Sequence, residues 1–313
     1  MIKKSSAFSI VLLATALSAS FSASAGFVEV GAEFRDFSTN YETESWFRPY
    51  TKWMVNPIEG SPFKVIGRMD YRHYDLPAQR QWGNHARQEL YVGYRWKFDD
   101  FVFAPKVGFR HASFSNDSRV TEYRVYPNMR YKINSTFSVA IDGFLAPVDV
   151  KGVPRMGKAE LNEVGINKKV DRVNYSDYTH EIDFILSTKL AKDKRLLASI
   201  YSETYRKGKE GRDAKNKQVE ALELRLAYSQ NFGDLRVSPY TYIDISRDIE
   251  SADGVKREGL RQRYGVEAAY KLTEKLAFQT RIFYQTEEVE DREHVKQDDK
   301  NYMNYKASFK YSF

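Results

Sequence analysis

Apolar and polar residues alternate with a period of two along almost the whole chain, and this pattern limits the fold more than any other feature. At the C-terminal end, Tyr305, Phe309 and Phe313 occupy apolar positions, and Lys306 and Lys310 occupy polar ones. Because successive side chains of a strand point to opposite faces, the pattern predicts strands with one apolar and one polar face. Fourteen such segments are predicted, at residues 27–37, 45–55, 63–74, 86–98, 101–111, 121–133, 137–147, 178–190, 195–206, 219–230, 235–247, 260–272, 276–287 and 302–313.

The connections between these segments fall into two classes of length. Six are short and rich in turn residues: 56–62, 99–100, 134–136, 191–194, 231–234 and 273–275. Seven are longer and polar: 38–44, 75–85, 112–120, 148–177, 207–218, 248–259 and 288–301. Alternating short turns and long loops are typical of transmembrane β-barrels, as are strands of this length. The sequence therefore predicts an all-β fold, one transmembrane antiparallel up-and-down β-barrel of about 14 strands. The even strand number places both termini on the periplasmic side.

The polar face of these strands is too highly charged to lie in a dry core. Charged residues make up 29% of the chain, and burying unpaired charge is costly. That face must therefore contact water, while the apolar face contacts lipid and the sheet closes, because an open edge is not stable in hydrocarbon. The residues predicted to line the pore are Arg35, Arg48, Lys52, Lys64, Arg68, Arg72, Arg87, Glu89, Arg95, Lys106, Arg110, Arg124, Arg130, Arg225, Tyr240, Tyr242, Arg261, Arg263 and Arg281.

The N-terminal segment has the features of a secretory signal peptide. Lys3 and Lys4 precede a short apolar run, and small residues end at Ala25. We therefore expect residues 1–25 to be removed and residues 26–313 to form a single domain in the bacterial outer membrane. The net charge of +7 does not then indicate a nucleic-acid partner, because an exported protein does not normally meet one. The chain has no cysteine, which excludes disulfides, thiol catalysis and a lipid anchor on cysteine.

Two further features concern the strands themselves. The chain ends in aromatic residues at alternate positions, Tyr311 and Phe313, and such an ending is similar to the signal read by the outer-membrane assembly machinery. Prolines within predicted strands argue against the assignment, because each removes a hydrogen-bond donor from the ladder. They all fall on the predicted outer face, where local bulges could accommodate them: Pro49, Pro105, Pro127 and Pro239.

The chain resembles the outer membrane protein G family of monomeric fourteen-stranded porins. The stretches that carry the resemblance are 87–90 (RQEL), 99–101 (DDF), 237–241 (VSPYT), 257–259 (REG) and 311–313 (YSF). The resemblance implies a monomeric channel that passes ions, sugars and other small hydrophilic solutes. It also implies gating by a loop at about 248–259, with the candidates Asp248, Glu250, Asp253, Lys256, Arg257 and Glu258.

Gating by pH is not carried over from that family. The family's histidine pair has no counterpart here, since the matching neighbourhoods at 257–260 and 285–288 contain no histidine. His294 lies in another loop, where a solvated histidine is the simpler interpretation. The longest predicted loop, 148–177, carries several basic residues and is either a constriction that folds inward or a mobile surface loop.

Basic positions outnumber acidic ones on the predicted inner face, which suggests a mild preference for anions, including acidic sugars. The alternative is that the charges pair across strands and leave weak selectivity. Two other functions stay open, a structural or adhesive barrel with a plugged lumen and a barrel hydrolase built on His111, Ser113 and Asn116. The second is disfavoured because no further motif accompanies those residues. No catalytic residue, metal site or cofactor is therefore predicted, and the expected partners are membrane lipids, lipopolysaccharide and small solutes.

Overall fold

The computed structural model describes residues 26–37, 45–74, 83–154, 172–207, 218–250, 256–291 and 300–313. The predicted signal peptide, 1–25, lies outside them. No helix in this part of the chain is long and apolar enough to cross a membrane. The strands are β1 (Phe27–Phe37), β2 (Trp46–Val55), β3 (Lys64–Tyr74), β4 (His85–Gly93), β5 (Trp96–Phe98), β6 (Phe101–Phe103), β7 (Lys106–Phe114), β8 (Arg119–Tyr126), β9 (Met129–Lys132), β10 (Phe137–Pro154), β11 (Arg172–Lys189), β12 (Lys194–Lys207), β13 (Gln218–Phe232), β14 (Leu235–Glu250), β15 (Lys256–Lys271), β16 (Leu276–Asp291) and β17 (Lys300–Ser312).

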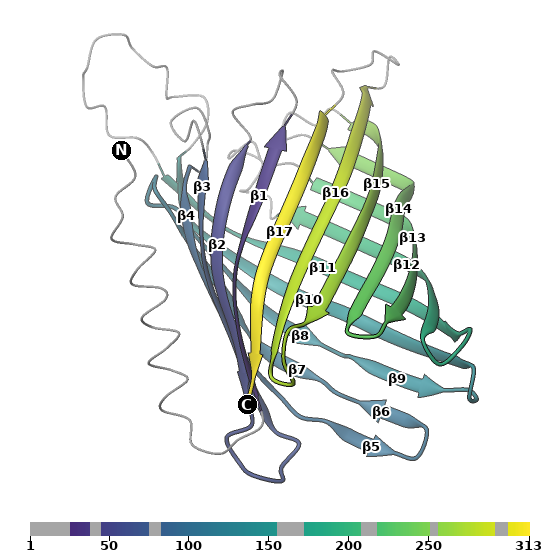
Figure 1. The fold of residues 1–313 in the computed structure, drawn as a ribbon. Coiled ribbons are helices and arrows are strands. Elements are labelled where there is room, and N and C mark those ends of the chain that lie inside the picture. Colours follow the sequence, from purple (N-terminus) through teal and green to yellow (C-terminus); the bar gives the residue numbers. More distant parts are fainter. Residues whose placement is uncertain are drawn as a thin grey trace.

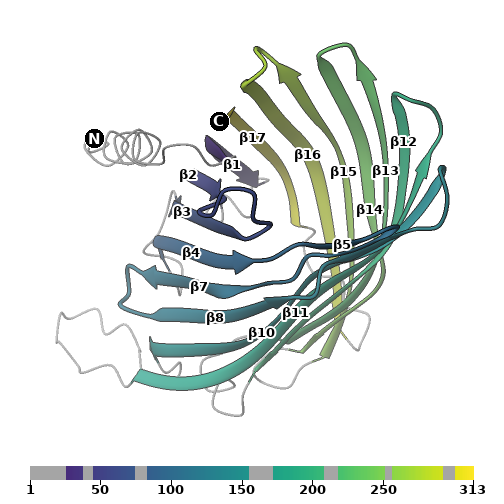
Figure 2. The same cartoon turned by 90° about the horizontal axis from the view of Figure 1, so that it is seen from below.

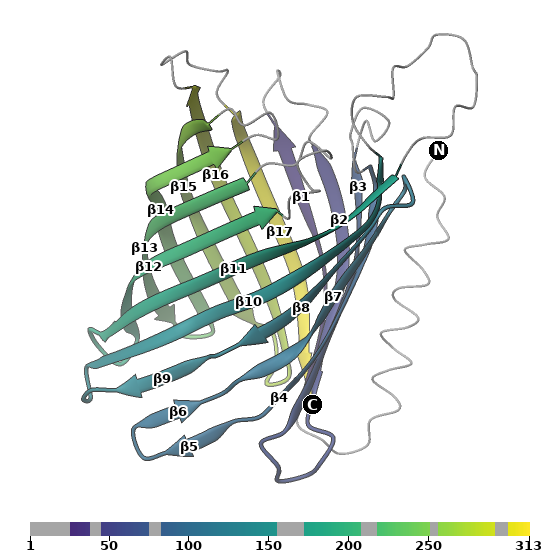
Figure 3. The ribbon, with the colours of Figure 1, turned by 180° about the vertical axis from the view of Figure 1, so that it is seen from behind.

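The strands form one closed antiparallel barrel (Figures 1 and 3). Three pairs of short strands, β4 with β5, β6 with β7 and β8 with β9, are each two halves of one longer strand, so the wall has fourteen strands. Closure occurs between β1 and β17, which lie side by side (Figure 2). At this seam the N–H of Gly26 donates to the carbonyl of Phe313 over 3.1 Å, and that of Phe313 donates to Gly26 over 3.2 Å. The predicted fold class is confirmed.

Short hairpins lie at one end of the barrel, together with Gly26 and Phe313; we call this the hairpin end, and the opposite end the loop end. At the loop end the structure corrects three predicted boundaries. Both ends of the predicted loop 148–177 are strand, because β10 continues to Pro154 and β11 begins at Arg172; residues 155–171 lie outside the described part of the chain. The predicted loop 112–120 is only a tight turn, closed by the N–H of Phe114 donating to the carbonyl of Ser118 over 3.0 Å. The third correction, at 248–259, concerns the candidate gate and is described below.

The extension of β10 and β11 has a packing reason. Val148 and Val150 alternate with polar residues but lie on the inner face, on the same side of β10 as Asp142. With Val153, which follows a bulge, they pack against Tyr175 of β11 in a buried apolar cluster. A cluster that excludes water stabilises strand pairing beyond the length that a bilayer requires.

The prolines occupy positions that a ladder can tolerate. Pro105 lies between β6 and β7, and Pro127 lies between β8 and β9, so each marks a break in a strand. The two breaks are adjacent, because the N–H of Ala104 donates to the carbonyl of Asn128 over 2.8 Å. Pro49 and Pro239 stay inside β2 and β14, opposite Ala32 and Val266 on the outer face.

Gly143 of β10 lies in the same region and has a φ of +125°, a backbone conformation that residues with a side chain rarely adopt. A Cβ atom there would lie 1.9 Å from the carbonyl oxygen of Glu181 on β11. Beyond the two breaks, β5, β6 and β9 continue the wall toward the hairpin end, where β9 pairs with β6 and with β10 (Figure 3).

Candidate functional site

The inner face of the barrel is identified by contacts between strands that are not neighbours. Arg261 of β15 and Glu203 of β12 form an ion pair of 3.3 Å, although β13 and β14 lie between their strands. Side chains can meet over two intervening strands only on the concave side of a curved sheet. Strand register then assigns each remaining side chain to one face. All nineteen residues of the predicted lining set fall on this inner face.

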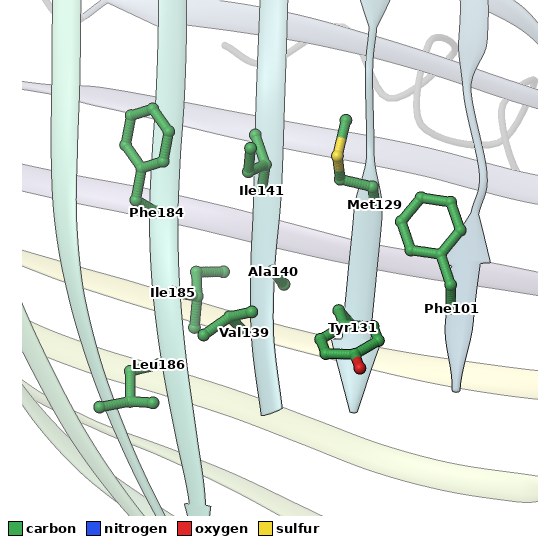
Figure 4. A pocket seen from close by; sticks show the side chains of 9 residues that line it. All are labelled: Phe101, Met129, Tyr131, Val139, Ala140, Ile141, Phe184, Ile185 and Leu186. Carbon is green, nitrogen blue, oxygen red and sulfur yellow. The ribbon is translucent and has the colours of Figure 1, made fainter. Parts of the chain in front are cut away.

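The outer face carries large apolar side chains that are exposed in the isolated chain. Examples from opposite sides of the wall are Phe47, Val125, Phe184 and Tyr284. An apolar groove of about 420 Å³ on this face is shown in Figure 4, with Phe184, Ile141 and Met129 contributed by three neighbouring strands, β11, β10 and β9. Exposed apolar surface on this scale needs an apolar environment, and hydrocarbon supplies one.

One group of inner-face ion pairs is centred on Glu33 of β1. Its carboxylate accepts hydrogen bonds from Arg48 of β2, from Arg281 of β16 over 3.2 Å and from the side-chain amide of Asn304 on β17 over 3.0 Å. The Glu33 side chain is 5% exposed. A carboxylate buried to this extent needs such partners, because an unpaired buried charge is strongly destabilising.

A second group joins four strands, β12 to β15. Glu223 accepts from Arg225 over 2.6 Å and from Arg261 over 3.2 Å, and its side chain is only 1% exposed. Asp244 accepts from Arg247 over 2.6 Å, and Arg247 approaches Glu203 to 3.8 Å. This group fixes the positions of two predicted pore-lining arginines, Arg225 and Arg261.

Arg247 and Glu203 were not predicted to line the pore. Simple alternation from Asp244, which is on the inner face, would place Arg247 on the outer face. The register of β13 and β14 shifts between Leu222 and Glu223, and this shift brings Arg247 to the inner face. Nothing in the local sequence marks that bulge. Glu203 lies on β12, whose two faces differ little in composition, so the sequence pattern does not assign its side chain clearly to one face.

Two smaller groups of ion pairs involve strands β3, β4, β7 and β8. Asp70 accepts from Arg68 over 2.9 Å and from Arg87 over 2.6 Å. On the next strands, Glu122 pairs with both Arg110 and Arg124. The expected alternative, in which charges pair across strands, therefore holds for much of the inner face.

Several predicted lining residues nevertheless form no ion pair within the described part of the chain: Arg35, Lys52, Lys64, Arg72, Arg95, Lys106, Arg130 and Arg263. Three of them, Lys64, Arg95 and Arg130, line an inner-face groove of about 300 Å³ near the hairpin end, which also contains Asp142. The unpaired charge on the inner face is therefore mainly positive.

Tyr240 and Tyr242 of β14 lie on the inner face, with ring centroids 4.9 Å apart and ring planes tilted by 38°. Tyr240 packs with Phe283 of β16, on the far side of β15, in a buried cluster. Gly265 of β15 lies between them, and a Cβ atom there would be 2.5 Å from Cζ of Tyr240. The missing side chain thus leaves room for the two rings.

Five of the six gating candidates lie in strands rather than in a loop. Asp248 and Glu250 belong to β14, and Lys256, Arg257 and Glu258 belong to β15; Asp253 lies outside the described residues. The ladder pairs Asp248 with Glu258 and Glu250 with Lys256. The boundaries predicted for the loop at 248–259 were therefore wrong, because both strands continue past them; residues 251–255 lie outside the described part of the chain.

The remaining predicted positions are the C-terminal aromatics and the hydrolase alternative. Tyr311 lies opposite Val28 on β1, and its ring centroid is 6.5 Å from that of Phe313. His111 is hydrogen-bonded to Thr121 over 2.9 Å and to Ser113 over 3.1 Å. The strand register puts His111 on the outer face, with Phe109, rather than in the enclosed interior.

No protein-family model matches the chain, and no curated protein matches its sequence. Solved structures do match its fold. The monoaromatic hydrocarbon channel CymD is 6% identical with a TM-score of 0.51, and the match covers 92% of this chain and 88% of that one. The toluene transporter TodX of Pseudomonas putida is 8% identical with a TM-score of 0.50, covering 94% of this chain and 91% of that one.

OmpT, an outer membrane protein of Vibrio cholerae, is 10% identical with a TM-score of 0.45, covering 92% of this chain and 96% of that one. The chain has the fold of an outer-membrane β-barrel, as CymD and TodX show. At these identities the similarity concerns the fold alone. Membership of the outer membrane protein G family is not confirmed.

Proposed function

We propose that the protein is an outer-membrane channel through which small hydrophilic solutes diffuse passively, with a mild preference for anions. The observation that carries the proposal is the opposite chemistry of the two faces of one closed wall. The outer face is apolar and suits lipid, whereas the enclosed face carries charged and hydrogen-bonding side chains that suit water. A barrel of fourteen strands is wider than the eight-stranded barrels that side chains fill.

The preference for anions rests on the charges that remain after ion pairing. Most inner-face carboxylates, including Glu33, Asp70 and Glu223, are held by arginines. The unpaired basic side chains described above outnumber the unpaired acidic ones, such as Asp142 and Glu267. A wet lumen with excess positive charge favours anions at its entrance and along its length.

The proposal includes the outer membrane as the location, the hairpin end with both termini on the periplasmic side, and a protein that acts as a monomer without catalytic activity. Acidic sugars are within the proposed solute class, because guanidinium groups bind carboxylates through two hydrogen bonds. The hydrolase alternative is less well supported, since His111 and Ser113 lie on the outer face, away from the enclosed polar surface.

Solute flux into liposomes tests the proposal. Refolded residues 26–313 should allow swelling in isotonic arabinose, and glucuronate should enter at least as fast as arabinose despite its larger size. Heat-denatured protein is the control for leakage. A barrel whose fold is verified by circular dichroism, but which admits neither sugar, would favour the structural barrel with a plugged lumen.

A further inference from the structure

Three arginines toward the loop end of the inner face lie on one continuous arc of the wall. Arg72 comes from β3, Arg35 from β1 and Arg263 from β15. Arg35 is close enough to the other two for their positive charges to repel it. We call these three residues the arginine arc. None of them forms an ion pair within the residues that the structure describes.

Aromatic rings contact the guanidinium groups of Arg35 and Arg72, whereas carboxylates contact those of the ion-paired arginines. The Cζ atoms of Arg35 and Arg72 lie 4.9 Å and 4.5 Å from the ring centroid of Trp46. Arg35 also lies 4.2 Å from the ring of Tyr302 on its other side. The rings position the cations and supply an attractive surface, but they accept none of the strong N–H hydrogen bonds that a carboxylate would accept.

The third arginine is positioned by an amide. Nε and one terminal nitrogen of Arg263 donate to the side-chain oxygen of Gln285, over 2.9 Å and 2.7 Å. Gln285 is paired with Tyr302 in the ladder, so it continues the arc from Arg35 to Arg263. A neutral amide orients the guanidinium without neutralising its charge.

Hydrogen-bond donors on the arc therefore remain unused. A guanidinium group has five N–H donors. Arg35 donates none of them to another described side chain, and Arg72 donates only to the hydroxyl of Tyr74. The Nε atoms of Arg35 and Arg72 are buried without a partner, although both side chains are partly exposed on the inner face. Converging positive charges with free donors suit a polyvalent anion.

We propose that the arginine arc is a binding site for solutes that carry carboxylate groups. The carboxylates would accept hydrogen bonds from the terminal nitrogens of Arg35, Arg72 and Arg263 and relieve the repulsion among the three charges. Trp46 and Tyr302 position the arginines and are themselves buried, at 2% and 5% exposed. The inference rests on the proposed channel function, because the solute must reach the inner face, and it names the solute class.

Citrate binding tests the arc without requiring conductance. Trp46 lies against the guanidinium groups of both Arg35 and Arg72, so bound citrate should change its fluorescence in the refolded protein in detergent at low salt. Comparison with Trp46→Phe shows how much of the fluorescence change comes from this tryptophan. The double variant Arg35→Gln/Arg263→Gln should raise the citrate dissociation constant roughly tenfold, since hydrogen bonds to charged groups are among the strong ones.

The control removes the same charge elsewhere on the inner face. Lys97→Gln/Lys132→Gln changes two exposed lysines near the hairpin end and should alter the dissociation constant by less than about twofold at moderate salt, because screening is effective over this separation. Heat-modifiable gel migration verifies that each variant folds. Equal weakening in both double variants, or no citrate-dependent signal in folded wild-type protein, would overturn the site. Citrate binding without any conductance would instead contradict the channel while leaving the site standing.

Discussion

Arg261 contacts Glu203 over 3.3 Å across two intervening strands, and the same guanidinium reaches Glu223 over 3.2 Å. These contacts make the inner face a network rather than a set of independent charges. Each carboxylate at the centre of a group binds arginines from different strands, so the ion pairs connect the wall as well as set its charge. The basic residues outside the network are the ones that we propose contact solutes.

Removing one buried carboxylate should destabilise the barrel. In Glu223→Gln, Arg225 and Arg261 lose a partner whose side chain is only 1% exposed, although they keep Asp183 and Glu203. We expect a loss of about 1–3 kcal/mol in the free energy of unfolding, the scale of a hydrogen bond to a charged group. The urea midpoint, followed by gel migration of unheated samples, should fall. Glu274→Gln, in an exposed hairpin turn, should leave it unchanged. A midpoint equal to that of the wild type would show that the network does not stabilise the wall.

Reversing two inner-face charges should shift ion selectivity toward cations. In Arg68→Glu/Arg110→Glu, Asp70 and Glu122 keep their second partners, Arg87 and Arg124, so the barrel should still fold. The anion-to-cation permeability ratio, from reversal potentials in a salt gradient, should fall by roughly two- to fivefold, the scale of a unit charge acting over several ångströms in a watery lumen.

The matched control for that reversal is Lys192→Glu/Lys275→Glu, which changes exposed lysines in hairpin turns. Its permeability ratio should change little at 0.15 M salt, where screening is strong. An equal permeability ratio in the wild type and in Arg68→Glu/Arg110→Glu would remove the assigned role of the inner-face arginines.

The ends of β14 and β15 should not move when the channel opens and closes. Asp248 and Glu258 are ladder partners, and the separation of directly paired residues suits a disulfide. Because the natural chain has no cysteine, Asp248→Cys/Glu258→Cys introduces the only possible bridge. Oxidation should leave the frequency of closures unchanged. If the bridge abolishes closures that dithiothreitol restores, separation of these strands is part of gating.

Phe313 should matter more for assembly in cells than for the folded barrel. Its backbone closes the seam with Gly26 through two hydrogen bonds, and these remain in Phe313→Ala. Refolding in detergent should therefore be near normal, whereas the amount of folded protein in outer membranes should fall severalfold. Phe232→Ala, at an exposed position beside another hairpin, is the control. Equal yields of Phe313→Ala and wild type in cells would contradict an assembly signal.

The strand count could be predicted because every strand carries its own period-two signal. The two strands that are broken at Pro105 and Pro127 also carry this signal. In each of them the apolar residues point to the same face before and after the break, so each is predicted as one strand. The extended ends of β10 and β11 were also visible in principle, since Val148 and Val150 alternate with Asp149 and Lys151. They were missed because the expected strand length was that of a membrane crossing.

The ion-pair network could not be predicted from the sequence. Arg261 and Glu203 are 58 residues apart and meet only because the wall curves. Arg247 reaches the inner face because of a bulge that no local sequence feature predicts. Counting charges on each face therefore showed a basic lumen, but it could not separate Arg225, held by two carboxylates, from Arg35, held by aromatic rings.

Single-channel current through the refolded protein in a planar bilayer, with the reversal potential under a salt gradient, tests the central claim most directly. We expect large unitary steps and a reversal potential on the anion side. A reversal potential on the cation side would contradict the role assigned to the unpaired arginines. The absence of current from a verified folded barrel would contradict the channel itself.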